Sequence, residues 1–400
     1  MNVFVINSGS SSIKYQLIRM PDAETICSGL IERIGLDGSA INHKTFIKGS
    51  EQSRKEKVFI PDHATGLREA ARLLTDKQIG VIKHPEEIDV VGHRVVHGGE
   101  SFSNTIIIND AVKEKIKSLF PLAPLHNPPN FLGIEVSEQV FKSAKQVAVF
   151  DTAFHQSIPP VAYRIAIPNE FYQKHGIRNY GFHGTSHKYV SAQAADYLKK
   201  DDSKLITIHL GNGCSMCAVR NGECVDTSMG FGPMNGLIMG TRTGDIDQSV
   251  IFHMVKQLGY SLDEVNNILN KKSGMLGLTG YSDMRDVQAE INKGNKDAAL
   301  AYEMYAYHIK KYIGTFVAVL NGLDALVFTA GVGENDSLTR HLATQQLEYL
   351  GIQLDQGKNK AGGKGIYEVN TNTSPAKILV VPTNEELEIA RQCYTLLGNV

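Results

Sequence analysis

The sequence lacks the features that mark several large classes of protein. Its 400 residues carry 41 Lys and Arg against 42 Asp and Glu, so the net charge is −1, without the basic excess of a nucleic-acid binder. Only five cysteines occur, and this odd, scattered set argues against a disulfide framework and indicates a reducing compartment. No window approaches about 18 apolar residues, and the first residues lack a basic segment. We therefore expect no signal peptide, no membrane span, no nucleic-acid partner and a cytoplasmic location.

Two familiar phosphate-binding motifs are also missing. Neither G-x-x-x-x-G-K-[ST] nor G-x-G-x-x-G occurs, which disfavours P-loop, Rossmann and protein-kinase folds. The segment 356–365, QGKNKAGGKG, has the composition of the first motif but not its spacing.

Short β-branched segments alternate with longer amphipathic ones along the chain. The strands that we expect cover residues 3–7, 88–91, 147–151, 205–210, 325–329 and 378–382. The helices that we expect cover residues 65–77, 111–119, 188–199, 249–258, 262–271 and 297–320. This alternation predicts an α/β architecture with helices packed on central sheets, and the length indicates two or three domains.

A strand–turn–strand pattern occurs twice, about half the chain apart. VFVINSGSSSIKYQLI begins at Val3 and LITIHLGNGCSMCAVRNG at Leu205, so that Gly9 corresponds to Gly213. The pattern indicates two similar domains that each open with a hairpin, although two unrelated hairpins would look the same. Small residues in such turns let backbone N–H groups approach an anion, and Lys14 beyond the first turn suits a phosphate.

Charged residues stand at several predicted strand ends. Arg94, in GHRVVHGG, suits bidentate capture of a carboxylate or phosphate, although an ordinary surface arginine is the alternative. Asp151 ends a predicted strand, where α/β proteins gather ligands, and Arg242 lies between glycines in GTRTGD. Glu385 and Glu386 are candidate ligands for a hard cation.

Other polar segments are typical of loops and turns. Three prolines in LAPLHNPPN, residues 122–130, predict a rigid loop that presents His126 and Asn127. The segment 328–335, FTAGVGEN, reads as a strand, a glycine turn and a helix N-terminus, which is a suitable seat for a nucleotide phosphate or ribose.

Histidine and cysteine pairs raise the question of a metal. His183 and His187 are four residues apart, but no Glu follows the first, so structural or anion-contacting histidines are favoured over ligands. Cys214 and Cys217 form CSMC in a predicted strand without a second pair, which favours buried packing cysteines over a redox or zinc motif.

Together these segments resemble the acetate kinase (acetokinase) family. The matching stretches occur in the family's order over nearly the whole chain: NSGSSSIK, HRVVHGGE, APLHNPPN, FDTAFHQSIP, YGFHGTSH, HLGNG, GTRTGDID, SDMR, GVGEN and TNEEL. Each stretch alone is weak evidence for the family, but ten stretches in the family's order are very specific to it.

The resemblance implies the fold of the actin/Hsp70/sugar-kinase superfamily. In that fold, two duplicated actin-like ATPase (ribonuclease H-like) domains each have a mixed central sheet flanked by helices, in agreement with the repeated hairpin. The implied domains are residues 1–152, completed by 386–400, and the nucleotide-binding residues 153–385, with the active site between them.

The resemblance also implies an activity. It is the reversible, direct in-line transfer of the γ-phosphoryl group of ATP to acetate, which gives acetyl phosphate and ADP. Mg²⁺ is the implied metal, with Mn²⁺ as a substitute, and the implied assembly is a homodimer.

Roles for individual residues follow from the resemblance. Asn7 and Glu385 would hold the magnesium, Arg94 would bind the substrate carboxylate, Asp151 is the family's proposed acid/base residue, and His183 and Arg242 would stabilise the transition state. The pocket for acetate would comprise Val96, Leu125, His126, Phe182 and Pro233. The contacts with ATP would be Ser10, Ser12, Lys14, His209, Leu210, Gly211, Asn212, Gly213, Asp283, Met284, Arg285, Gly331, Val332, Gly333, Glu334 and Asn335.

Three departures from the family pattern are small. The family often has Pro at Gln248, Ala at Cys214 and Gly at Ala330, and the last two adjoin expected ATP contacts. A further doubt concerns Asp151, because acetate is already ionised near pH 7 and needs no general base. We expect Asp151 to organise the magnesium or its waters instead.

Alternative functions remain at this stage. A propionate or butyrate kinase would use the same chemistry with a larger pocket, and the branched side chain of Val96 favours acetate. A nucleotide-binding scaffold or chaperone of the actin/Hsp70 type would bind ATP without carboxylate turnover and would leave Arg94 and Arg242 unexplained. A zinc enzyme is disfavoured because the fourteen histidines show no ligand spacing.

Overall fold

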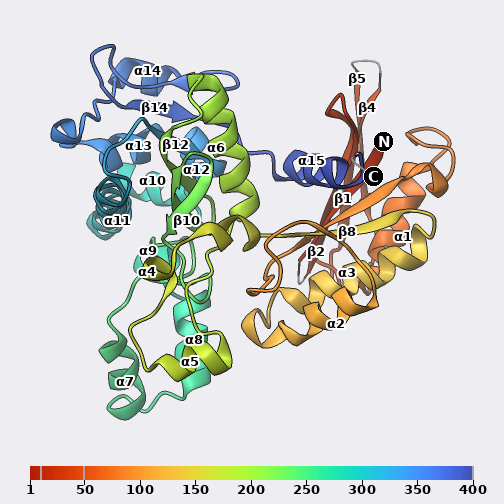
Figure 1. Ribbon diagram of the computed structural model, residues 1–400, viewed down its shortest axis with the longest axis horizontal. Helices are drawn as coiled ribbons and strands as arrows, with labels where there is room; N and C mark the ends of the chain where they lie inside the picture. Colours follow the sequence, from red (N-terminus) through yellow and green to blue (C-terminus); the bar gives the residue numbers. More distant parts are fainter. Residues whose placement is uncertain (10, 48–49, 399–400) are drawn as a thin grey trace. The chain divides into compact units, whose positions relative to one another are not determined.

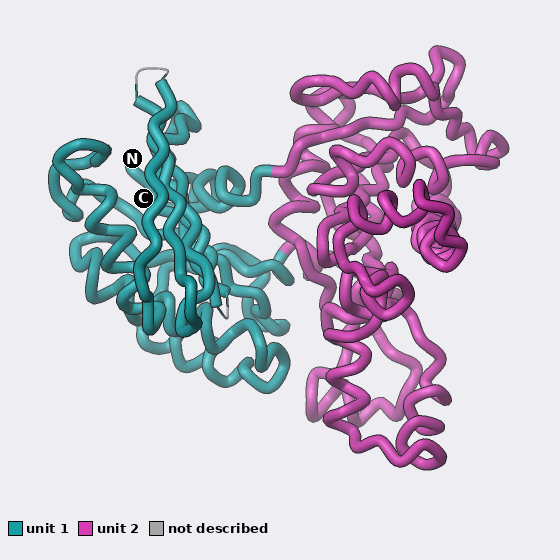
Figure 2. The backbone as a smooth tube through the Cα atoms, turned by 180° about the vertical axis from the view of Figure 1, so that it is seen from behind, with its two compact units in different colours: residues 1–153, 384–400 teal, residues 154–383 magenta. Residues whose placement is uncertain are grey.

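The chain divides into two compact units in the computed structural model, which describes residues 1–9, 11–47 and 50–398. One unit comprises residues 1–153 and 384–400, and the other comprises residues 154–383 (Figures 1 and 2). This division places Glu385 in the first unit. Within the described ranges, no helix has the length and apolar character needed to cross a membrane.

The first unit is built on an eight-stranded sheet in the order β5-β4-β3-β2-β1-β6-β8-β7. Strands β1, β6 and β8 are parallel, and the other pairings are antiparallel. The strands are β1 Asn2–Ser8, β2 Ser12–Arg19, β3 Glu24–Glu32, β4 Ala40–Ile47, β5 Ser50–Lys57, β6 Val90–Val95, β7 Ile106–Ile107 and β8 Lys145–Phe150. The α-helices are α1 His63–Leu74, α2 Asp110–Ser118, α3 Asn127–Val140 and α15 Glu385–Gly398.

Alternating side chains of β1 are buried on the two opposite faces of this sheet. Val3 and Val5 pack with Ile389 of α15, whereas Phe4 and Ile6 belong to a separate core with residues of α1 and α3. Successive side chains of a strand point to opposite faces, so a run of apolar residues requires cover on both sides. The C-terminal helix α15 supplies one of these covers and lies against the strands in Figure 1.

The second unit has a six-stranded sheet in the order β11-β10-β9-β12-β14-β13. Helices α6 and α11 pack against β9, on opposite sides of the sheet (Figure 1). The strands are β9 Lys204–Leu210, β10 Cys214–Arg220, β11 Glu223–Thr227, β12 Ala325–Thr329, β13 Tyr367–Glu368 and β14 Lys377–Val380. The α-helices are α4 Pro160–Tyr163, α5 Asn169–His175, α6 Gly184–Leu198, α7 Gln248–Lys256, α8 Leu262–Lys271, α9 Gly274–Thr279, α10 Met284–Asn292, α11 Lys296–Leu320, α12 Ala330–Asn335, α13 Ser337–Thr344 and α14 Gln356–Ala361.

The two sheets share one topology. In the first unit β3, β2 and β1 are antiparallel neighbours, followed by parallel β6 and β8. In the second unit β11, β10 and β9 are antiparallel neighbours, followed by parallel β12 and β14. The hairpins β1–β2 and β9–β10 therefore occupy equivalent places, which confirms the predicted duplication and the α/β class.

One expectation about local structure was wrong, and three strands were missed. Residues 122–130 are not one rigid loop, because α3 begins at Asn127 and its two prolines lie in the first turn, where a missing N–H costs no helical hydrogen bond. Strands β3 to β5 were not expected. The mostly exposed residues of β5, SEQSRKEK, carry no apolar alternation from which a strand could be predicted.

Buried histidines predict that the first unit is sensitive to acid. Burial lowers the pKa values of His43, His93 and His97 to about 4, from an ordinary value of 6.5. Between these values the unfolded chain binds more protons than the folded chain. We therefore expect the free energy of unfolding to fall as the pH drops from 6.5 towards 4, by up to about 1.4 kcal/mol per pH unit for each histidine.

Denaturation followed by circular dichroism at several pH values would measure this slope. His93→Leu should reduce it, because one titrating group is removed, whereas His175→Leu at an exposed position should not. An equal slope in the wild type and His93→Leu would contradict the assignment.

Candidate active site

Three polar side chains of the first unit meet at the carboxyl ends of neighbouring parallel strands. Asn7 lies near the end of β1, Arg94 near the end of β6, and Asp151 directly after β8. Arg94 donates from Nε to Oδ1 of Asp151 at 3.0 Å, and from Nη2 to Oδ2 at 2.5 Å. Its Nη1 donates to Oδ1 of Asn7 at 3.2 Å. The side chain of Asp151 is 1% exposed and that of Arg94 is 19% exposed, so the two form a bidentate ion pair shielded from solvent.

Charged residues at the start of α15 adjoin this ion pair. Burial raises the pKa of Glu385, and although Arg94 opposes the rise, the carboxylates of Asp151 and Glu386 add to it. In the part of the chain that the structure describes, no side chain donates a hydrogen bond to Glu385. Glu386, in contrast, pairs with Nζ of Lys14 at 2.5 Å.

This cluster has the composition of a site for a hard cation. The carboxylates of Asp151, Glu385 and Glu386 face two cationic side chains, so negative charge is in excess. A carboxylate without a donor at Glu385 and an amide oxygen at Asn7 are ligand types that Mg²⁺ accepts. The residues present therefore fit the Mg²⁺ that the family resemblance implies.

The expected phosphate hairpin of the first unit is only partly described. Ser10 lies outside the described residues. Ser12 opens β2, and the ammonium group of Lys14 is engaged by Glu386. In this arrangement Lys14 compensates the acidic cluster.

Helix α3 holds the end of β6 in place. Asn130 accepts from the N–H of Val96 at 3.0 Å and donates to the carbonyl of Ser8 at 2.6 Å, so one amide ties β1 to the segment after β6. Asn127 is buried and exchanges two hydrogen bonds of 3.0 Å with the backbone of His97, so it is not presented to a ligand as expected. Asn130 was not foreseen. An i,i+3 pair of asparagines on one helical turn is the signal that could have found it.

The residues expected to line the acetate pocket divide between the units. Val96 is buried and Leu125 is 56% exposed in the first unit, and His126 directly precedes α3. Phe182 is buried in the second unit, and Pro233 is half-buried there.

In the second unit, His183 lies beside the glycine turn between β9 and β10. Its backbone is left-handed, with φ of +55°, directly before α6. Its ring stacks on His209 with centroids 4.3 Å apart, and its Nδ1 is 2.8 Å from Oγ of Ser215. A Cβ atom on Gly213 would stand 3.3 Å from Cε1 and Nε2 of His183 and 3.7 Å from Nη1 of Arg242. The turn, the imidazole and the guanidinium therefore converge at Gly213.

Arg242 carries a charge that no carboxylate neutralises within the described ranges. Its Nη1 donates to the carbonyl of Pro233 at 2.9 Å and approaches the sulfur of Met239 at 3.8 Å. Burial lowers the pKa of Arg242, because the charged form is partly desolvated. The loop that carries it is braced on the glycine turn, since Gly240 donates to the carbonyl of Asn212 at 3.0 Å. A half-buried guanidinium with neutral partners, beside a turn of backbone N–H groups, suits an anion.

The close packing at Gly213 leads to a prediction. Gly213→Ala should lower kcat by about 10- to 100-fold, because the methyl group would displace the imidazole of His183 by a few tenths of an ångström. Gly314→Ala in α11 is the control, since its Cβ would meet no atom of the described residues within 4 Å. Steady-state kinetics with circular dichroism would separate lost activity from lost fold, and unchanged kinetics in Gly213→Ala would contradict the placement of His183.

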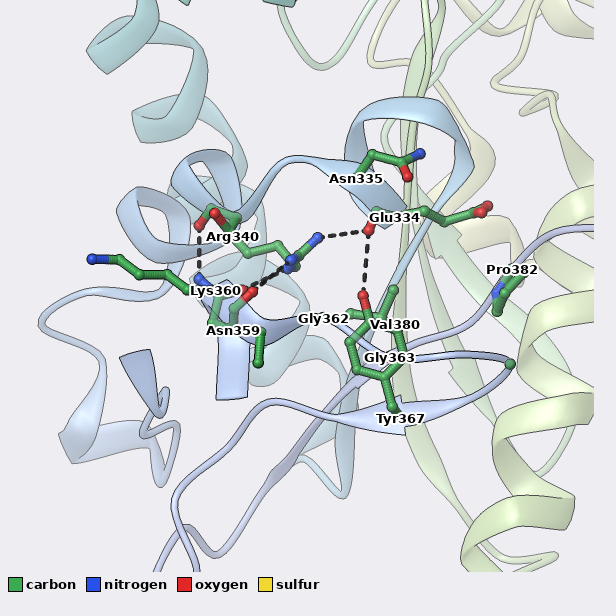
Figure 3. A pocket seen from close by; sticks show the side chains of 13 residues that line it. Glu334, Asn335, Arg340, Asn359, Lys360, Gly362, Gly363, Tyr367, Val380 and Pro382 are labelled. Atoms are coloured by element: carbon green, nitrogen blue, oxygen red, sulfur yellow. Dashed lines mark hydrogen bonds between the residues drawn. The ribbon is translucent and has the colours of Figure 1, made fainter. Parts of the chain in front are cut away.

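Helix α12 and the segment after it border a polar cavity of about 320 Å³ (Figure 3). Glu334 and Asn335, both expected ATP contacts, line one side of it. Arg340 is almost fully buried and donates to the carbonyls of Gly333 and Glu334, and to Oδ1 of Asn359 at 2.7 Å. Arg340 and Asn359 were not foreseen, although Asn359 belongs to the glycine- and lysine-rich segment 356–365.

Other expected ATP contacts have mixed exposure. Asp283 caps α10 and pairs with the highly exposed Arg285 at 2.5 Å, whereas Met284 and Leu210 are buried in the core of the unit. Ala330 has φ of +64°, in the left-handed region that favours glycine.

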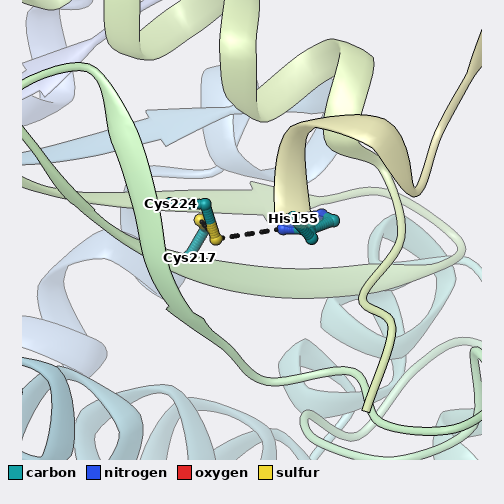
Figure 4. Close-up of side chains that lie close together, drawn as sticks. All are labelled: His155, Cys217 and Cys224. Carbon is teal, nitrogen blue, oxygen red and sulfur yellow. Dashed lines mark hydrogen bonds between the residues drawn. The ribbon is translucent and has the colours of Figure 1, made fainter. Parts of the chain in front are cut away.

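Two buried thiols, those of Cys217 and Cys224, lie beside His155 and form a short series of hydrogen bonds with it (Figure 4). Cys217 donates to the sulfur of Cys224 at 3.0 Å, and Cys224 lies 3.1 Å from Nδ1 of His155. His155 Nε2 donates to the carbonyl of Phe182 at 2.9 Å. Ligand atoms on a zinc ion with bonds near 2.0–2.3 Å would stand about 3.5–4 Å apart, so these separations favour hydrogen-bonded thiols over a metal site.

The chain is similar to known proteins over nearly its whole length. Residues 2–391 match the model of the acetokinase family. A relative named acetate kinase, from Flavobacterium johnsoniae, is 60% identical over 100% of both chains. Among solved structures, the acetate kinase of Porphyromonas gingivalis matches with a TM-score of 0.92 at 43% identity and 99% of both chains. A propionate kinase of Francisella tularensis matches with 0.92 at 41% identity and 98% of both. The chain belongs to the acetokinase family.

Proposed function

We propose that this protein is an acetate kinase, which transfers the γ-phosphoryl group of ATP reversibly and in line to acetate. The observation that carries the proposal is the uncompensated guanidinium of Arg242 beside His183 and the turn at Gly213. These groups would bind the equatorial oxygens of the phosphoryl group during transfer. Phosphoryl transfer requires charge neutralisation and positioning more than covalent chemistry.

Arg94 would receive the acetate carboxylate. Its guanidinium already has a fixed orientation, because Asp151 and Asn7 occupy one donor of each nitrogen. One donor each on Nη1 and Nη2 is left for an incoming carboxylate. Acetate is ionised near pH 7 and attacks without a base. Asp151 would therefore orient Arg94 and contribute charge to the cation site.

Mg²⁺ would be held by Asn7 and Glu385. When bound, it would neutralise negative charge on the phosphates. The proposal further includes a homodimer, which the family resemblance implies, and a cytoplasmic location, which the few, scattered cysteines indicate.

The second candidate is a propionate kinase. It is supported by the structural match to the propionate kinase of Francisella tularensis, whose TM-score of 0.92 equals that of the match to the acetate kinase of Porphyromonas gingivalis. The branched and buried side chain of Val96 favours the smaller acid, although one methylene changes binding by only about 1–3 kcal/mol. We expect propionate to be a poorer substrate.

Hydroxylamine trapping of the acyl phosphate tests the function. The purified protein would receive Mg-ATP with acetate, propionate or butyrate in parallel. Acyl hydroxamate with acetate preferred would support the proposal, and preference for a longer acid would keep the chemistry and reject the pocket argument. ATP binding without any hydroxamate would reject the kinase and favour a nucleotide-binding scaffold.

A further inference from the structure

Behind His183 runs a chain of buried hydrogen bonds that leads away from the proposed site. Nδ1 of His183 meets Oγ of Ser215 at 2.8 Å, and the same oxygen meets Nε2 of His187 at 2.7 Å. Nδ1 of His187 meets Oγ1 of Thr207 at 2.7 Å, and Thr207 also lies 3.4 Å from the carbonyl of Cys217. Ser215, His187 and Thr207 are all completely buried.

The directions of these hydrogen bonds depend on one another, because Ser215 and His187 each have only one hydrogen to donate within the chain. Ser215 has one hydroxyl hydrogen, so it can donate to one imidazole and must accept from the other. Burial keeps His187 neutral by lowering its pKa well below 6.5, so its ring also has one donor and one acceptor. All bonds of the chain therefore point in the same direction, and the tautomer of His183 is tied to its neighbours rather than to solvent.

A second chain holds the backbone next to His183. The carbonyl of Phe182, the preceding residue, accepts from Nε2 of His155, whose Nδ1 faces the thiol of Cys224. The left-handed backbone of His183 costs a non-glycine residue free energy and persists only where the surroundings over-determine it. One series of hydrogen bonds holds the ring of His183 and the other holds the backbone before it, and together they keep this conformation in place.

We infer that Ser215, supported by His187 and Thr207, is a positioning residue that holds the imidazole of His183 through Nδ1. The opposite edge of the ring, with Nε2, is thereby kept facing Gly213 and Arg242. This inference rests on the proposed phosphoryl transfer. Ser215 itself touches neither the phosphoryl group nor the nucleotide in this role, and it acts through His183 alone.

Ser215→Ala is the direct test. We expect kcat to fall about 10- to 100-fold while KM for ATP and acetate changes less than about threefold, because misplacing one group by a fraction of an ångström is felt mainly in the transition state. Ser191→Ala is the matched control, since it removes another buried hydroxyl. Oγ of Ser191 donates to the backbone carbonyl of Lys188 in α6 and takes no part in the hydrogen bonds behind His183. The control should keep its kcat.

A double-mutant cycle with His183→Ala separates positioning from general structural damage. If Ser215 acts only through His183, adding Ser215→Ala to His183→Ala should change kcat by less than about twofold. Equal losses in both backgrounds, or a kcat of Ser215→Ala close to the wild type, would overturn the inference.

A second pair of variants keeps the test valid if Ser215→Ala does not fold. Thr207→Val removes the hydroxyl at nearly constant shape, and Thr207→Ser retains it. We expect Thr207→Val to lower kcat and Thr207→Ser to restore most of the loss, whereas equal activity of the two would count against the chain. A wild type that binds ADP but makes no acyl hydroxamate would refute the proposed function, and this outcome is distinct from both results.

Discussion

Replacement of Arg242 by glutamine is expected to lower kcat by about 10³- to 10⁵-fold, the range measured for arginines that stabilise phosphoryl transfer. Among the residues that the structure describes, the guanidinium has only neutral partners, Pro233 and Met239, so its charge remains available to the transferred group. Its contribution is made in the transition state, so KM should change far less than kcat. Steady-state kinetics by the hydroxamate assay would measure both.

Arg220→Gln is the matched control for this replacement. Arg220 also donates to a backbone carbonyl at 2.9 Å in the second unit, that of Val319, but it lies on the surface. Arg220→Gln should therefore keep wild-type activity. Arg242→Lys should recover only part of the loss, because an ammonium group lacks the planar, bidentate fork. A kcat of Arg242→Gln within tenfold of the wild type would refute the role of Arg242.

Replacement of Asp151 by alanine is expected to destabilise the first unit by about 3–5 kcal/mol, because it leaves a shielded guanidinium without its carboxylate. The pair is bidentate, and the acid is 1% exposed. The same variant should also lose most of its activity, since Arg94 would lose the partner that fixes its orientation. Urea denaturation followed by circular dichroism would measure the stability of this tryptophan-free chain.

Glu24→Ala provides the comparison within the same unit. Glu24 also pairs with an arginine, Arg19, at 2.8 Å, but both side chains are about half exposed. Such surface pairs contribute about 0–1 kcal/mol. Equal losses of stability in Asp151→Ala and Glu24→Ala would show that the Arg94–Asp151 pair is not shielded as described.

Several features could be predicted because they depend on local pattern. A helix was expected over residues 262–271, and α8 has these bounds, Leu262–Lys271, with Ser261 and Glu264 forming a capping box at its start. The repeated hairpin indicated the duplication, and both copies occupy equivalent places in the two sheets. For α11, the apolar spacing predicts a helix but does not tell which apolar side chains are buried. Leu300 is 58% exposed, whereas Ile309 and Ile313 are buried.

Contacts between distant segments could not be predicted in the same way. The sequence around Asp151 does not indicate that its partner is Arg94. The sequence around Lys14 likewise does not indicate that its ammonium group pairs with Glu386 instead of binding a phosphate. Asn130 and Arg340 appear ordinary in the sequence, and only packing shows that they hold β1 against the segment after β6 and α12 against α14.

By itself, the sequence determined the family, the α/β class, the duplication and the residue types of the site, because these depend on motifs and on the periodicity of apolar residues. Only the tertiary structure decided which charges meet, which remain uncompensated and how His183 is held. The reason is physical: a charge or hydrogen bond acts over a few ångströms in space, and the partners of Arg94 and His183 come from strands and loops far apart in the chain.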